Sequence, residues 1–167
     1  MPFKGKSPEL SSEEKVKSDA LRLLSVRPRS VEELRGRLKF KRHDGPAVDS
    51  VIELLTKQGL LDDEKFARLF AGSKTATKPV GKKQLALDLK RKGLSPRIIQ
   101  GTLENLGDYD EKEAVRKLAQ NRFSRMSGLT PQKAKARLFG FLKRRGFSND
   151  AIFSALSEVI KDGSIES

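Results

Sequence analysis

The chain has 167 residues, of which 36% are hydrophobic and 34% charged, and its formal net charge is +13. This low apolar fraction favours thin cores beneath amphipathic elements over one deep interior. Cysteine is absent, which excludes disulfides and thiolate metal sites, and no stretch has the roughly 20 apolar residues of a membrane helix. We therefore expect a cytoplasmic protein without membrane segments whose partner is a polyanion.

The first third of the chain has the signals of three helices. Ser11 with Glu14, and Ser30 with Glu33, have the spacing of a capping box and predict two helix starts. Residues 44–46, Asp-Gly-Pro, form a predicted turn before a third helix. The apolar residues in all three segments recur with helical period.

The same order of elements follows twice more. The acidic pair at residues 62–63 starts the next predicted helix as a cap, and Asp110 starts the corresponding helix in the last third. Gly93 and Gly146 are predicted to end the second helix of their units. Arg42 occupies that place in the first unit, so we expect the Asp-Gly-Pro turn to end its helix instead.

Two polar stretches follow the first helices of the second and third units. Ser73–Val80 and Ser124–Thr130 are rich in Gly, Pro, Ser and Thr, which predicts mobile loops. Limited proteolysis is accordingly expected to cut first within residues 74–82 or 122–133.

Five apolar positions recur in three segments with identical spacings of 4, 10, 4 and 3 residues, and the segments are offset by 51 and 53 residues. Such self-similarity indicates stacked helical units. We predict an all-α fold of three tandem three-helix repeats forming an elongated, curved array. Its predicted parts are an N-terminal tail (1–11), repeats at 12–59, 60–107 and 108–160, and a C-terminal tail (161–167). The matched residues are Leu34, Leu38, Val48, Ile52 and Leu55; Leu85, Leu89, Ile99, Leu103 and Leu106; and Leu138, Leu142, Ile152, Leu156 and Val159.

The positive charge belongs to the second helix of each repeat. Residues 30–43, 81–93 and 131–146 carry net charges of +3, +4 and +6, which together equal the net charge of the whole chain. Cations in the last turn also complement the helix dipole, for roughly 0.3–1 kcal/mol each. Several, such as Lys82 and Lys133, lie at the opposite end, which favours a polyanion-binding face. The residues predicted for this face are Arg35, Lys39, Lys41, Arg42, Lys82, Lys83, Lys90, Lys92, Lys143, Arg144 and Arg145.

Catalytic and metal-binding patterns are missing from the sequence. The sole histidine, His43, lies at a helix end, where capping of backbone carbonyls is its expected role. Without a second histidine or a cysteine, the usual metal cages and nucleophile–base pairs cannot be assembled. Phe139 and Phe141 occupy places where the second repeat has no aromatic residue. A base-stacking platform is the alternative role for them, and packing against a neighbouring repeat is the one we expect. We predict neither an enzyme nor a cofactor or metal site.

Three stretches resemble the RecX family of regulatory proteins. Residues 20–34 contain ALRLL and RPRSVEEL, and residues 59–67 read GLLDDEKFA, the most recognisable stretch of the family. Gly81, Leu85, Leu89 and the pair at 93–94 follow its Gly-x3-Leu-x3-Leu-x3-Gly-Leu pattern. The resemblance covers about residues 12–160, the third repeat mainly by register.

This resemblance implies a regulator that lies in the helical groove of the RecA–DNA filament and modulates, in the direction of inhibition, ATP hydrolysis and strand exchange during recombination and repair. The implied partners are the RecA filament and, non-specifically, single- or double-stranded DNA, with the protein a monomer. Two alternatives remain open. One is a stand-alone DNA-binding module whose second helix enters a major groove. The other is an adaptor for another acidic protein.

Overall fold

The computed structural model describes residues 10–163, which leaves most of the two predicted tails outside the described residues. Within this range the chain forms nine α-helices and no strand, which confirms the all-α prediction. Three helices make up each of three repeats: α1 (Ser12–Val26), α2 (Val31–Phe40) and α3 (Gly45–Lys57); α4 (Asp63–Thr77), α5 (Lys82–Arg91) and α6 (Pro96–Glu104); α7 (Glu111–Phe123), α8 (Pro131–Arg144) and α9 (Asn149–Gly163).

Both predicted capping boxes have the hydrogen bond to the serine hydroxyl, but only the one at Ser11 also has the bond to the glutamate carboxylate. The Ser11 hydroxyl accepts from the Glu14 amide at 3.2 Å, and the Glu14 carboxylate accepts from the Ser11 amide at 2.7 Å. The Ser30 hydroxyl likewise accepts from the Glu33 amide at 3.1 Å. The Glu33 carboxylate, however, bonds Arg27 and Lys92 and does not return to the cap.

The second helices all end in the same way, and here the sequence prediction for the first repeat was wrong. Arg42 has φ 62°, in register with Gly93 and Gly146, which both have φ 78°. The first repeat therefore uses the same left-handed stop, although that conformation costs a non-glycine residue roughly 1–2 kcal/mol. Asp44 is instead the N-cap of α3, and Gly45 is the first residue of that helix.

The predicted loop at Ser73–Val80 is mostly helix, because α4 continues to Thr77. The hydroxyl of Thr75 donates to the carbonyl of Ala71 at 3.0 Å, so this buried polar side chain is satisfied inside the helix. Residues 124–130, in contrast, connect α7 to α8 without regular helix, as predicted.

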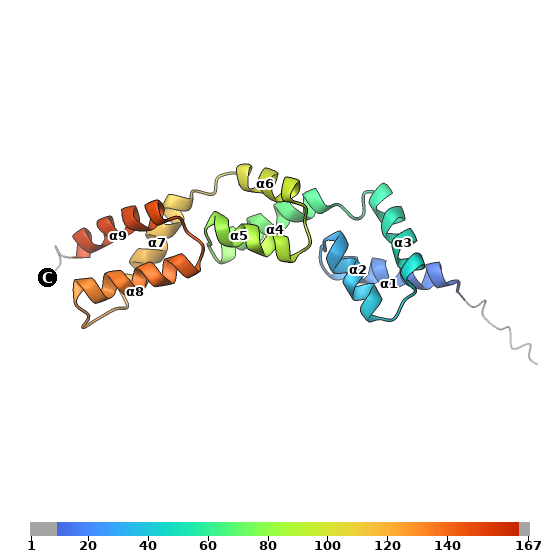
Figure 1. Ribbon diagram of the computed structural model, residues 1–167, viewed down its shortest axis with the longest axis horizontal. Helices are drawn as coiled ribbons and strands as arrows, with labels where there is room; N and C mark the ends of the chain where they lie inside the picture. The colour runs from blue at the N-terminus through green and yellow to red at the C-terminus, as the bar shows by residue number, and fades with distance from the viewer. Residues whose placement is uncertain (1–9, 164–167) are drawn as a thin grey trace, which may run out of the picture. The chain divides into compact units, whose positions relative to one another are not determined.

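The chain divides into two compact units, and the division falls within α4. Among the described residues, one unit comprises 10–66 with 92–94, and its core joins α1, α2 and α3. The other comprises 67–91 and 95–163, and its largest apolar cluster joins α7, α8 and α9, which lie side by side in Figure 1. All five matched apolar residues are buried in the first and third repeats, whereas in the second only Leu85 and Leu89 are.

Candidate functional site

One matched set of predicted cations faces solvent. Lys39, Lys90 and Lys143 occupy equivalent positions on α2, α5 and α8, and all three are exposed. The Nζ atom of Lys143 donates to the amide oxygen of Asn149 at 2.5 Å, a contact that leaves its charge uncompensated. Among the described residues, none of the three lysines pairs with a carboxylate.

A second matched set of cations lies two residues further along the chain and bonds to other parts of the same molecule: Lys41, Lys92 and Arg145. Lys41 Nζ lies 2.7 Å from Asp19 Oδ1, and His43 Nε2 lies 2.8 Å from the other oxygen of that carboxylate. Hydrogen bonds from Lys41, His43 and Arg22 hold the pKa of Asp19 well below its usual range. His43 therefore bonds a side chain of α1, and the predicted capping of backbone carbonyls was wrong.

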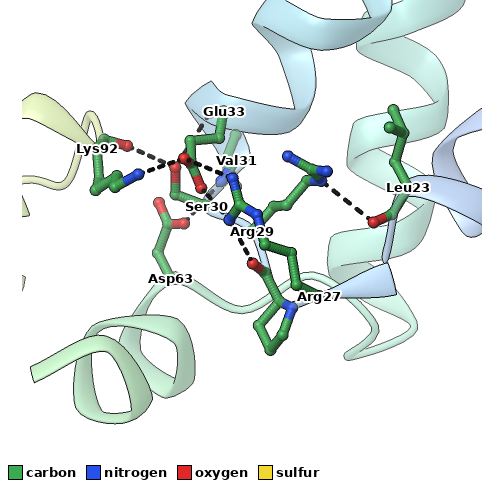
Figure 2. Close-up of polar contacts among 9 residues, drawn as sticks. Leu23, Arg27, Arg29, Ser30, Val31, Glu33, Asp63 and Lys92 are labelled. Carbon is green, nitrogen blue, oxygen red and sulfur yellow. Dashed lines mark hydrogen bonds and ion pairs between the residues drawn. The ribbon is translucent and has the colours of Figure 1, made fainter. Parts of the chain in front are cut away.

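Lys92 lies at a contact between the first repeat and residues 92–94, which we call the first junction. The Ser30 hydroxyl donates to the Lys92 carbonyl at 2.5 Å, and Lys92 Nζ lies 2.6 Å from Glu33 Oε1. Figure 2 shows these three residues converging beside Arg27, which also pairs with Glu33. Burial raises the pKa of Glu33, but hydrogen bonds from Arg27 and Lys92, together with their charges, outweigh it and lower the pKa to about 2.

The two aspartates at the start of α4, Asp62 and Asp63, make different contacts. Asp62 caps the helix as predicted, because its Oδ1 accepts from the Lys65 amide at 2.9 Å. Asp63 Oδ1 accepts from the Val31 amide at 2.8 Å and so belongs to the first junction. Burial is the largest influence on the Asp63 carboxyl and raises its pKa. No sequence signal distinguished these two aspartates.

Arg145 lies at the corresponding contact between the second and third repeats, which we call the second junction. The Gly81 amide donates to the Arg145 carbonyl at 2.8 Å, and Arg145 Nη1 donates to the Pro79 carbonyl at 3.2 Å. The Lys82 amide donates to Glu111 Oε1 at 3.3 Å. Gly81 and Lys82 are in register with Ser30 and Val31, so the two junctions reuse one arrangement.

The left-handed glycines also lie at these junctions. A Cβ on Gly93 would overlap the Glu32 side chain, and one on Gly146 would overlap the backbone of Gln84. A Cβ on Gly81 would in turn overlap the backbone of Gly146. The motif glycines therefore permit the close approach of neighbouring repeats in addition to ending helices.

The other predicted site residues fall into two groups. Arg35 pairs with Glu32 and with Asp49, so its charge is compensated within the molecule. The remaining four are exposed, and in the part of the chain described here they form no ion pair: Arg42, Lys82, Lys83 and Arg144.

Arg144 additionally lines a cavity of about 580 Å³ in the third repeat, together with three arginines absent from the predicted face: Arg122, Arg125 and Arg137. Sequence reasoning counted Arg137 in the charge of its helix without assigning it to the face, and it missed Arg122 and Arg125 because they come from the end of α7 and the following loop. Elsewhere in residues 10–163, no group of histidine, cysteine or acidic side chains gathers to hold a metal ion. No helix in that range has the length and hydrophobicity of a membrane span.

Each of the three repeats matches a domain of one known protein family. The models of the first, second and third three-helix domains of RecX match residues 17–55, 62–103 and 109–156. Regulatory protein RecX of Chlorobium phaeobacteroides (strain BS1) is 35% identical over 142 residues, covering 85% of this chain and 91% of that protein. The Amycolatopsis mediterranei (strain U-32) protein of that name is 30% identical over 162 residues, covering 95% and 93%. The crystal structure of RecX from Lactobacillus salivarius shares the fold, with a TM-score of 0.79 at 24% identity over 89% of this chain and 96% of that one.

Proposed function

The chain belongs to the RecX family, and from this premise we propose that it binds the RecA–DNA filament along its helical groove. There it modulates RecA, in the direction of inhibiting ATP hydrolysis and strand exchange. It acts as a cytoplasmic monomer without catalysis of its own, and its relatives carry the name of regulatory proteins. The repeat boundaries at 12–59, 60–107 and 108–160 remain part of this proposal.

The observation that carries the proposal is the separation of the two matched sets of cations. Lys41, Lys92 and Arg145 have partners within the molecule. Lys39, Lys90 and Lys143 are exposed and lack carboxylate partners in the described part of the chain. Uncompensated like charge, repeated once per repeat, suits a partner that is itself repetitive and anionic. A filament of protein and DNA has that character.

The test is cosedimentation of the full chain with preassembled RecA–DNA filaments. The triple variant Lys39→Glu, Lys90→Glu and Lys143→Glu is expected to lose filament binding, and with it any effect on the RecA ATPase, while its circular dichroism remains that of the wild type. Each phosphate contact removed should lower the salt dependence of binding by about one unit of slope. Parallel arms with bare DNA and with RecA alone separate the filament from either component.

A matched control reverses the same amount of charge on the first helices. Lys15, Lys65 and Lys112 are exposed, lie in the first turns of α1, α4 and α7, and belong to different repeats. Glutamate there favours the helix dipole, so the fold should not suffer. This control is expected to keep filament binding. Equal loss of filament binding in both triple variants would show that only net charge matters. Retained binding by the variant of the second helices would refute the proposed face.

A further inference from the structure

The arginine-lined cavity of the third repeat is open and basic. It lies between the end of α7, the following loop and one side of α8, where Arg137, Gly140, Phe141 and Arg144 recur at helical spacing. Its volume of about 580 Å³ falls within the range of roughly 300–1,000 Å³ typical of small-molecule sites. Its lining residues, all of them in the described part of the chain, include four arginines and no carboxylate.

The arginines of this cavity differ from four others, which are paired with carboxylates on their own helices. Arg22, Arg35, Arg91 and Arg116 each pair with a carboxylate three residues away on their own helix. Within residues 10–163, none of the four cavity arginines forms such a pair. Four guanidinium groups around one opening repel each other, so an anion between them would be attracted by all four.

The cavity also has an aromatic wall. The guanidinium of Arg122 lies 5.2 Å from the centroid of the Phe141 ring, and that of Arg145 lies 5.1 Å from it. Such cation–π contacts attract the two guanidinium groups to the ring and limit the motion of both side chains, which lowers the entropy that binding has to remove. A guanidinium plane is itself a surface on which a nucleobase stacks. Met126 and Leu129 extend the apolar part of the wall.

A neighbouring cavity shows by contrast why the first one suits an anion. It measures about 420 Å³ and shares Phe141 and Arg144 with the first. Its wall includes Asp88, which pairs with Lys74 at 3.0 Å. The cations of the second cavity are therefore partly compensated within the protein, and those of the first are not.

We propose that the arginine-lined cavity binds a nucleotide. Its phosphate is held by Arg125, Arg137 and Arg144, whose planar forks match phosphate oxygens in pairs. Its base lies against the guanidinium of Arg122 and the ring of Phe141. The ligand is either a free nucleotide or one unit of a single strand, since both present the same phosphate and base. This site is separate from the matched lysines of the filament proposal.

Gly140 offers a way to block the cavity without harming the fold. It lines the cavity, and a Cβ placed on it would approach only the Nη1 atom of Arg144, at 3.3 Å. Glutamate is a better helix former than glycine, so Gly140→Glu should not weaken α8 while it introduces a carboxylate among the arginines. Gly36 is the equivalent position of α2, is exposed, and has nothing near its Cβ position. Gly36→Glu is thus a matched control.

The experiment measures fluorescence anisotropy of a labelled oligothymidylate and, separately, of a labelled adenosine nucleotide with the full chain. Gly140→Glu and the double variant Arg125→Gln with Arg137→Gln are each expected to weaken binding by about tenfold or more, as expected for the loss of hydrogen bonds to a charged group. The control Lys65→Gln with Lys112→Gln removes equal charge from exposed positions of α4 and α7 outside the cavity. It and Gly36→Glu should bind like the wild type, and Gly140→Glu should melt no lower than the wild type.

Binding of the oligothymidylate alone would identify a strand as the ligand, and binding of the adenosine nucleotide would identify a free one. Three results would overturn the proposal: cavity variants that bind like the wild type, controls that lose as much as the cavity variants, or displacement of the nucleotide by polyglutamate at equal concentration of charge. The last would indicate an acidic protein. Because the assay contains no RecA, its failure is distinct from a failure of the filament proposal.

Discussion

The two junctions have the same backbone arrangement and different chemistry. In each, the left-handed turn at the end of one second helix approaches the first turn of the preceding one, and the carbonyl of Lys92 or Arg145 accepts a hydrogen bond there. The first junction makes that bond with the Ser30 hydroxyl and adds a charged group, Glu33. The second makes it with the Gly81 amide.

This difference means that the Lys92 carbonyl depends on a side chain for its hydrogen bond, whereas the Arg145 carbonyl is held by a direct backbone contact. Glu33 is in register with Gln84, so the ion-paired carboxylate of the first junction is replaced by a neutral amide in the second, while Asp63 and Glu111 accept equivalent amide hydrogen bonds in both. A Cβ on Gly146 would meet the backbone of Gln84, and one on Gly93 would meet the Cβ and Cγ atoms of Glu32. We therefore expect the hydroxyl of Ser30 and the ion pairs of Glu33 to matter at the first junction, and the space beside Gly146 to matter at the second.

The largest effect is expected at Gly146. In Gly146→Ala, the left-handed φ costs about 1–2 kcal/mol and the overlap with Gln84 adds about 1–3 kcal/mol. Urea unfolding should therefore show a loss of about 3 kcal/mol. The control is Arg42→Gly at the equivalent stop, where glycine relieves the same backbone cost and stability should rise by up to about 1 kcal/mol. A mild effect of Gly146→Ala would mean that the second junction is not tightly packed.

An intermediate effect is expected at Ser30, which is fully buried. Ser30→Ala removes the N-cap of α2, for about 1 kcal/mol, and leaves the Lys92 carbonyl without its donor, for about 1–3 kcal/mol. A total loss of at least about 2 kcal/mol should appear in thermal unfolding. Ser30→Gly is the informative comparison, because glycine caps a helix almost as well as serine and occupies this position in the second junction. Equal losses in the two variants would show that the first junction cannot adopt the backbone bond of the second.

The smallest effect is expected at Glu33. Its pKa of about 2 lies below the ordinary value, so its stabilising contribution is complete above the ordinary pKa and is lost as pH falls toward 2. Glu33→Gln should cost about 1 kcal/mol at neutral pH and flatten the acid part of the stability curve. The raised pKa of Asp63 has the opposite sign, since its protonation relieves a buried charge.

Asp63→Asn is therefore introduced into both the wild type and Glu33→Gln. It removes the opposing titration of Asp63, so that the contribution of Glu33 can be measured by itself. Acid unfolding followed by circular dichroism from pH 7 to low pH measures all four proteins. Identical acid profiles with and without Glu33→Gln would show that the ion pairs of the first junction contribute nothing to stability.

Local signals in the sequence determined the helices, their repeat and their stops. Capping residues such as Ser11 satisfy free amides of the first turn, and apolar residues at helical spacing identify the face that is buried. These interactions span only a few residues, so they can be read without the fold. The stop at Arg42 escaped detection because arginine enters the left-handed region at an energetic cost, and nothing nearby in the chain reveals that the cost is met.

The tertiary structure alone decided which of the matched cations remain available to a partner. Lys39 and Lys41 lie about 200° apart around a helix with 3.6 residues per turn, so they cannot share a face. Only the packing of neighbouring elements decides which of these two sides of the helix is covered. In this fold, Asp19, Glu33 and Pro79 lie against Lys41, Lys92 and Arg145. The cavity arginines are likewise united only by the packing of α7 against α8, because segments distant in sequence acquire a common electrostatic environment only when the chain folds.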